Sequence, residues 1–283
     1  MVKRLRVSVA AVLSLIAMAA PAAAQSINRS VTELLGAMEV PIEQQSKGNV
    51  TLRVGLGAIV TSRLDAPSNL KVYPLPLIGF EYHNWLSIDE TQVRVNLINS
   101  DSPFRAGPMV RFDPGRGNFG NPGIPGLGKT PVSLEAGGFV SYSYGPARIR
   151  LRLRHNVTSS NGGSVGELDL RSGVYKSGPV GVAVQVQTVW ASKNYMERIY
   201  GVTATQSVKA HLPAFYLGPG MKDVNVTIYS EYKFSTRWSA VGAVQYVHVL
   251  GDAADSPIVR VRGSGNRVNV GMFVVYAFGT PNA

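Results

Sequence analysis

Residues 148–154 read Arg-Ile-Arg-Leu-Arg-Leu-Arg, a strict alternation of cationic and aliphatic side chains. Side chains two residues apart on a β-strand share one face, so the four guanidiniums point one way and the aliphatic side chains the other. An arginine facing hydrocarbon costs about 2–4 kcal/mol at mid-depth. The stretch therefore predicts a strand with one wet face and one lipid face, as in the wall of a membrane barrel. The four arginines are Arg148, Arg150, Arg152 and Arg154.

The neighbouring predicted strands offer Glu135, Glu167 and Asp169 as partners for these arginines. Two interpretations stay open. The charges could form an ion-pair network that fills or stiffens the lumen, or they could line an electropositive pore or anion site.

Alternation with a period of two dominates the chain from Val50 onward, and most runs are near ten residues, the length that crosses a bilayer at a tilt. Short and long connections alternate, as expected when turns face the periplasm and loops face outward. The alternating runs include 50–61, 132–144, 180–190, 224–234 and 268–278, the short links are 145–146, 177–178 and 235–237, and the long ones are 114–131, 158–166, 192–223 and 251–265.

The direction of each run fixes the number of strands. If 104–113 runs outward, then 93–98 runs inward and 85–88 is a short outward strand, with 72–82 and 50–61 before it. The prediction is an all-β fold, a transmembrane antiparallel β-barrel of about 12 strands, and the alternative is 10 if 85–88 merges with its neighbour.

Aromatic residues gather at the predicted strand ends, the pattern of the girdles at lipid–water interfaces. The rings expected at periplasmic ends are Tyr142, Tyr144, Phe234, Trp238, Tyr276 and Phe278, and Trp190 is expected at an outer end.

The first 24 residues have the order of a secretory signal peptide: basic residues, an apolar stretch and an Ala-x-Ala site before Gln25. We expect a cleaved signal peptide at 1–24, a polar N-terminal leader at 25–49 and an outer-membrane barrel at 50–283. The predicted location is the cell outer membrane, with its lipid as the surrounding partner.

Composition agrees with an exported membrane protein. Charged residues make up 16% of the 283 residues, against about 25% in typical soluble proteins. Cysteine is absent, which excludes thiol catalysis. The net charge is +11, or 11 − 3 = +8 without the three cations of the signal peptide. Export makes nucleic acid a poor partner for that charge.

Two enzyme-like patterns are expected to be accidental. Gly115, Gly117 and Gly120 match a dinucleotide fingerprint, but prolines follow where the helix must begin. Gly162, Ser164 and Gly166 match a nucleophile elbow but join two predicted strands.

His155 lies at an outer strand end where a lipase could keep a catalytic histidine, yet no serine is expected in register with it. No catalytic, cofactor or metal residues are predicted, and the protein is not expected to be an enzyme.

Several blocks of the second half resemble a known family. They are Asn194-Tyr195-Met196, Tyr200-Gly201-Val202-Thr203, Leu212-Pro213-Ala214-Phe215 and the loop 250–259, which reads LGDAADSPIV. Together with 72–77 and 135–137, these resemble the MltA-interacting protein (MipA)/OmpV family of outer-membrane proteins. In that loop the motif residues are Gly251, Asp252, Asp255, Ser256 and Pro257.

The resemblance implies an outer-membrane barrel that acts as a non-enzymatic scaffold in peptidoglycan remodelling. Its implied partners are a lytic murein transglycosylase and a bifunctional peptidoglycan synthase. Because the expected periplasmic turns are short, residues 25–49 are our candidate for the partner-facing element. The alternative function, from the arginine pattern, is a small-solute channel with an anion-leaning lumen.

Overall fold

The computed structural model describes residues 50–63, 66–89, 91–98, 102–115, 124–159 and 162–278. The predicted signal peptide and leader lie outside the described residues. So do Gly117 and Gly120 of the first glycine pattern.

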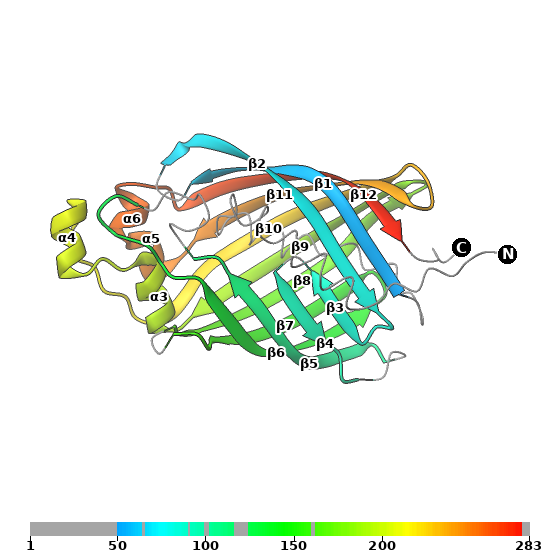
Figure 1. Ribbon diagram of the computed structural model, residues 1–283, viewed down its shortest axis with the longest axis horizontal. Coiled ribbons are helices and arrows are strands. Elements are labelled where there is room, and N and C mark those ends of the chain that lie inside the picture. Colours follow the sequence, from blue (N-terminus) through cyan, green and yellow to red (C-terminus); the bar gives the residue numbers. More distant parts are fainter. Residues whose placement is uncertain are drawn as a thin grey trace.

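In the described part of the chain, twelve antiparallel strands close into one barrel, in which each strand pairs with its neighbours in sequence and β1 pairs with β12 (Figure 1). The predicted count of twelve is therefore confirmed. The strands are β1 (Val50–Arg63), β2 (Ala66–Tyr82), β3 (Leu86–Asp89), β4 (Gln92–Val95), β5 (Phe104–Asp113), β6 (Ser133–Tyr144), β7 (Ala147–Asn156), β8 (Ser164–Ser177), β9 (Val180–Ala191), β10 (Gly220–Lys233), β11 (Trp238–Val249) and β12 (Asn266–Phe278).

The strict alternation of short and long connections is wrong at the first hairpin. β2 begins at Ala66, six residues before the predicted start at Val72, so only residues 64–65 separate it from β1. The strand at 85–88 does not merge with its neighbour, although β3 and β4 are only four residues long each.

The β2–β3 seam explains the prolines of β2. β1 pairs with β2 along its whole length, whereas β3 pairs only with Gly79–Tyr82. Among the described residues, the stretch 66–77 has no strand paired to it on its other side. Pro74 and Pro76 lie in this stretch, and a residue without an N–H group is tolerated in a strand where that group would face an open edge.

The polarity of the two faces of the barrel wall is the reverse of that in a soluble protein, because the outer face is apolar and the inner face is polar. Outward side chains are apolar and open, such as Leu151 at 45% and Met272 at 70% exposure, while inward polar residues such as Asp169 and Asn269 are buried. Apolar surface left uncovered around a closed barrel is what a lipid environment requires. Among the described residues, no helix is long and apolar enough to cross a membrane.

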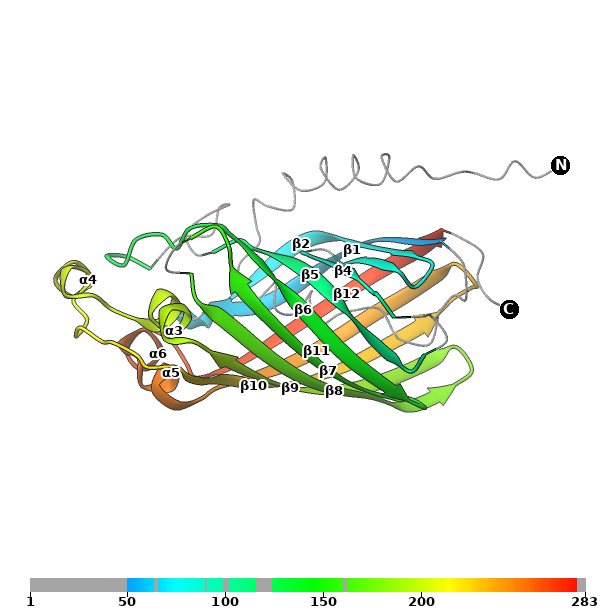
Figure 2. The same ribbon diagram turned by 90° about the horizontal axis from the view of Figure 1, so that it is seen from below.

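Four short helices lie in two long connections at one end of the barrel, which we call the loop end (Figures 1 and 2). They are α3 (Lys193–Tyr200) and α4 (Ala204–Ala210), between β9 and β10, and α5 (Gly251–Asp255) and α6 (Pro257–Arg260), between β11 and β12. The opposite end, with the tight β6–β7, β8–β9 and β10–β11 turns, is the turn end. The sequence predicted long loops at these places but not the helices.

The lipid-facing belt can be tested at Leu151. We expect Leu151→Arg to lower the free energy of unfolding in lipid vesicles by about 2–4 kcal/mol, measured by urea titration, because the guanidinium must leave water. Val208→Arg is the control, since Val208 is an exposed apolar residue on α4, outside the barrel wall. Equal effects of both changes would show that Leu151 does not contact hydrocarbon.

Candidate functional site: the charged lumen and its helical cap

The arginine ladder, Arg148, Arg150, Arg152 and Arg154, lies on the inner face of β7. All four residues are buried, and the aliphatic residues between them are open on the outer face. The alternation of the sequence thus becomes a row of four guanidiniums inside the barrel.

The predicted carboxylates lie within reach of this row. Arg154 donates through Nε to Glu135 (3.0 Å) and through both Nη atoms to Glu167 (2.9 and 2.6 Å). Arg152 binds Glu167 and Asp169, both at 3.0 Å. Arg148 lies 3.8 Å from Asp169. Register explains these contacts, since Arg152 is paired with Glu167 and Arg150 with Asp169 across β7 and β8.

Three further arginines lie beside this row. Arg111 of β5 reaches Glu167 (3.4 Å), and Arg171 of β8 lies opposite Arg148. Arg198 of α3 binds Asp113 (2.9 Å) and Ser133 (3.0 Å) and lies 3.9 Å from Glu135. Within the described residues this group counts seven arginines, the ladder plus these three, and four carboxylates, Asp113, Glu135, Glu167 and Asp169. This wall of the lumen is therefore cationic.

Arg111 and Arg171 occupy inward positions of strands that the sequence predicts, so the alternation rule could have found them. Arg198 could not be found this way, because it comes from a helix in a predicted loop.

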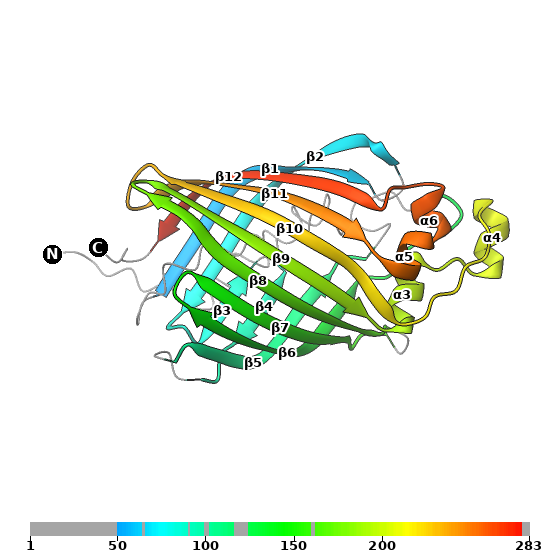
Figure 3. The ribbon, with the colours of Figure 1, turned by 180° about the vertical axis from the view of Figure 1, so that it is seen from behind.

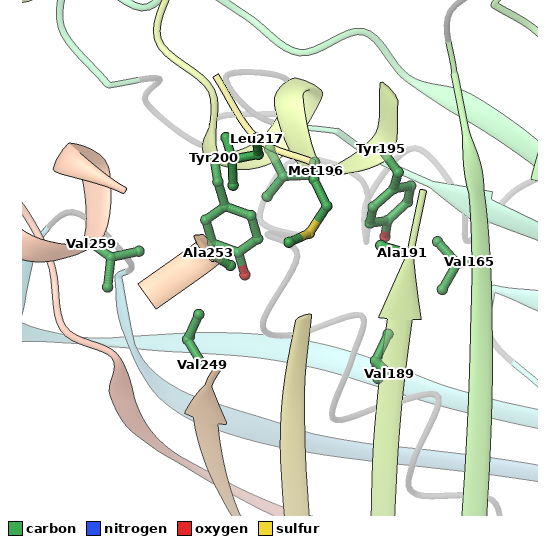
Figure 4. Close-up of a cluster of buried hydrophobic side chains, with 11 residues drawn as sticks. Val165, Val189, Ala191, Tyr195, Met196, Tyr200, Leu217, Val249, Ala253 and Val259 are labelled. Atoms are coloured by element: carbon green, nitrogen blue, oxygen red, sulfur yellow. The ribbon is translucent and has the colours of Figure 1, made fainter. Parts of the chain in front are cut away.

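The helices at the loop end have a hydrophobic core of their own. Tyr195, Met196 and Tyr200 of α3 are buried between the last residues of the barrel strands and the α5–α6 segment (Figure 4). The other members include Val165, Val189, Ala191, Ile199, Leu217, Val249, Ala253 and Val259.

A second cluster ties the β5–β6 loop to this assembly. Ile124 and Leu127 of that loop pack with Val202, Leu212 and Ile258. We call α3–α6 with residues 124–130 the cap. Because the cap has packed cores and an ion pair to the barrel wall, it is held in place on the loop end.

The residues of the 250–259 loop build the cap. Gly251 has φ of 51°, a conformation that favours glycine, where β11 passes into α5. The Ser256 hydroxyl is fully buried, donates to the Tyr200 carbonyl (2.6 Å) and accepts from the Ile258 N–H (3.2 Å), and Pro257 follows as the first residue of α6. Asp252 lies in the first turn of α5, and Asp255 binds Arg260 (2.7 Å) at the surface.

A family model described as MltA-interacting protein MipA matches residues 54–278. The chain belongs to the MipA family. No curated protein matches it in sequence.

Solved structures resemble the chain only distantly. The NanC porin has 8% identity and a TM-score of 0.42, with 80% of this chain and 98% of that chain covered. An outer membrane channel from Pseudomonas putida F1 has 10% identity and a TM-score of 0.44, with 85% and 100% covered. OmpT, an outer membrane protein of Vibrio cholerae, has 10% identity and a TM-score of 0.36, with 83% and 99% covered. These likenesses say nothing about ligand or partner.

As a MipA-family barrel the chain lies in the outer membrane, where short turns face the periplasm and long loops face outward. The turn end is therefore the periplasmic end.

The predicted interface aromatics lie near strand ends on the outer surface. Tyr144 and Phe234 are open, and Trp238 stacks edge-on against Tyr276, with ring centroids 4.9 Å apart. Tyr276 contacts Phe278 in the same way at 4.6 Å. Tyr142 packs on Phe104 at the periplasmic end, and Trp190 is 42% exposed near the loop end. Their role as a lipid-interface girdle remains a prediction.

His155 does have a serine in register, contrary to expectation. It pairs across strands with Ser164, and its Nδ1 lies 2.9 Å from the serine Oγ on the exposed surface. Among the described residues, no carboxylate or amide contacts the other ring nitrogen, so the pair lacks the third group that orients the imidazole in serine hydrolases. In the same residues, no group of three or more metal-ligating side chains occurs.

Arg198 should hold the cap on the lumen. We expect Arg198→Met to raise amide hydrogen exchange in α3 by roughly tenfold or more, since a buried charge-assisted bond contributes about 1.5–3 kcal/mol. Lys193→Met on the same helix is the control, because the Lys193–Glu197 contact is long (3.9 Å) and exposed and should contribute little. Equal amide hydrogen exchange of α3 in the wild type and in Arg198→Met would show that the Arg198–Asp113 ion pair does not hold the cap in place.

Proposed function

We propose that this chain is a non-enzymatic outer-membrane scaffold in peptidoglycan remodelling. In this proposal it holds a lytic murein transglycosylase and a bifunctional peptidoglycan synthase at the periplasmic face of the membrane. The observation that carries the proposal is membership of a family described as MltA-interacting.

The geometry supports a periplasm-facing role. The loop end is covered by the cap, whose cores are packed and whose Arg198 is bound to Asp113 of the barrel wall. The ion pairs of Arg154 and Arg152 link β6, β7 and β8 from inside, which stiffens the wall. A stiff barrel with a packed cap at its outer end suits a platform that holds soluble partners on the other side.

The turns at the periplasmic end are tight, so they offer a small docking surface. We therefore propose that the partners bind the leader, residues 25–49, which would extend into the periplasm after cleavage of the signal peptide.

Deleting residues 25–49 should abolish co-purification of the murein enzymes with the barrel from detergent-solubilised outer membranes. The control carries a scrambled leader of the same composition and should also lose the partners. Heat-modifiable electrophoretic mobility shows whether each variant forms a barrel. If a folded deletion variant still recovers all the partners, the leader is not the binding element. If no murein enzyme co-purifies with the wild-type barrel, the scaffold function is wrong.

A second candidate is a small-solute channel that favours anions. The specific observation behind it is the cationic wall, with seven arginines against four carboxylates, because a lumen lined by one sign of charge concentrates counter-ions.

The channel should give an anion-selective conductance in planar bilayers, and Arg150→Gln should lower the ratio of anion to cation permeability. Lys209→Gln on α4 is the control, because Lys209 is exposed on the cap and outside the lumen. No conductance, or cation selectivity in the wild type, would contradict the channel.

A further inference from the structure

A cavity of about 640 Å³ lies at the periplasmic end of the barrel, and its lining includes Glu231, whose carboxylate lies 3.8 Å from the Lys233 ammonium. Its lining residues come from the β6–β7 turn and from the neighbouring ends of β8, β9 and β10. Figure 3 shows where these strands lie in the barrel. The size of the cavity is within the range of small-molecule sites, about 300–1,000 Å³.

Small residues at inward positions of adjacent strands hollow this part of the wall. Gly173, Ala183 and Tyr229 lie side by side across β8, β9 and β10. One step nearer the turn, Lys176, Gly181 and Glu231 form the next row. A Cβ on Gly181 would meet no atom within 4 Å, so the space in front of it is open.

A β-bulge brings a cation to the rim of this space. The register of β8 shifts between Gly173 and Tyr175, with Val174 as the extra residue. In a ladder without the bulge, Val174 would be opposite Val182 and Tyr175 would take the inward place opposite Gly181. With the bulge, Tyr175 is opposite Val182 and Lys176 is opposite Gly181. Bulges are over-represented at barrel rims and beside active sites, where they re-aim a side chain.

The inner wall of the cavity combines a cation with an aromatic ring. The Arg171 guanidinium carbon lies 4.2 Å from the centroid of the Tyr229 ring, and the Tyr229 hydroxyl donates to Gln185 (3.4 Å). Tyr229 also belongs to an apolar cluster inside the barrel with Val241 and Phe273, against which Ala183 packs. The cavity thus lies at the border between the cationic wall and an apolar patch.

We propose that this cavity binds a small organic anion with an apolar or aromatic body, which enters from the periplasm. Its carboxylate or phosphate would lie near Arg171 and Lys176, and its body against Tyr229 and Ala183. The site requires only binding, so it holds whether or not the barrel conducts ions or carries murein enzymes.

Isothermal titration of the barrel in lipid nanodiscs tests the site with three probes: 4-phenylbutyrate, the uncharged 4-phenylbutanol and phenyl phosphate. We expect at least one of the two anions to bind and the alcohol to bind roughly tenfold more weakly or not at all, since a charge-assisted contact contributes about 1.5–3 kcal/mol. Tighter binding of phenyl phosphate than of 4-phenylbutyrate would support the site and assign its head group to phosphate, and the reverse would assign it to carboxylate.

Two substitutions locate the binding. Gly181→Phe should fill the cavity and abolish binding without removing a charge, and Lys176→Glu should weaken binding of the anion roughly tenfold or more. Lys209→Glu makes the same charge change on the cap and should leave the affinity unchanged. Equal affinity for the alcohol and the anions, no binding of either anion to the wild type, or wild-type affinity in a folded Gly181→Phe barrel would overturn the proposal.

Discussion

Exclusion of charge from hydrocarbon is the constraint on which the rest of this structure depends. β7 carries a cation at every second residue, so its orientation is fixed, and one step of slippage would put four guanidiniums in lipid. Once inside, those guanidiniums crowd together and must share few carboxylates. Glu167 binds Arg154, Arg152 and Arg111. A buried ion pair is weak evidence of stability, but removing one partner leaves an uncompensated charge, so such a network tolerates few single changes. The charged wall therefore serves first to fix how the strands are placed.

The same shortage of carboxylates couples the lumen to the cap. Glu135 lies between Arg154 of β7 and Arg198 of α3, and Asp113 ends β5 within reach of Arg198. A helix in an outer loop thus completes an ion network that begins in the barrel wall. Its apolar side chains, Tyr195, Met196 and Tyr200, then pack over the strand ends. Displacing α3 would expose this hydrophobic core and break the ion pair at the same time. The contacts that hold the cap on the loop end are therefore cooperative.

The alternation of polar and apolar residues in the sequence predicted the twelve strands and the inward face of β7. It also predicted the partners of the β7 arginines, which are Glu135, Glu167 and Asp169. The prediction failed where this alternation breaks. Val174 is left out of the pairing in a bulge, and this bulge decides that Lys176 and not Tyr175 is in register with Gly181. Helices α3–α6 have four to eight residues each, too few to give a helical period. Tertiary contacts bury part of α3, α5 and α6, whereas the mostly exposed α4 begins at a capping box formed by Thr203 and Gln206. The contact of His155 with Ser164 was missed because the register of β7 with β8 depends on where a Gly-rich loop ends.

The barrel is therefore asymmetric along its axis, and the asymmetry bears on function. At the outer end, aromatic and aliphatic side chains pack over the strand ends and an arginine is clamped to the wall. At the periplasmic end, Gly173, Gly181 and Ala183 occupy inward positions of β8 and β9, where larger side chains would have filled the lumen. Filling is the cheaper solution for a wall that needs only stability, because each empty space forfeits van der Waals contacts. A hollow bordered by Arg171, Lys176 and Tyr229 is thus better explained by a ligand than by folding. It lies on the same side of the membrane as the murein enzymes that the scaffold would hold.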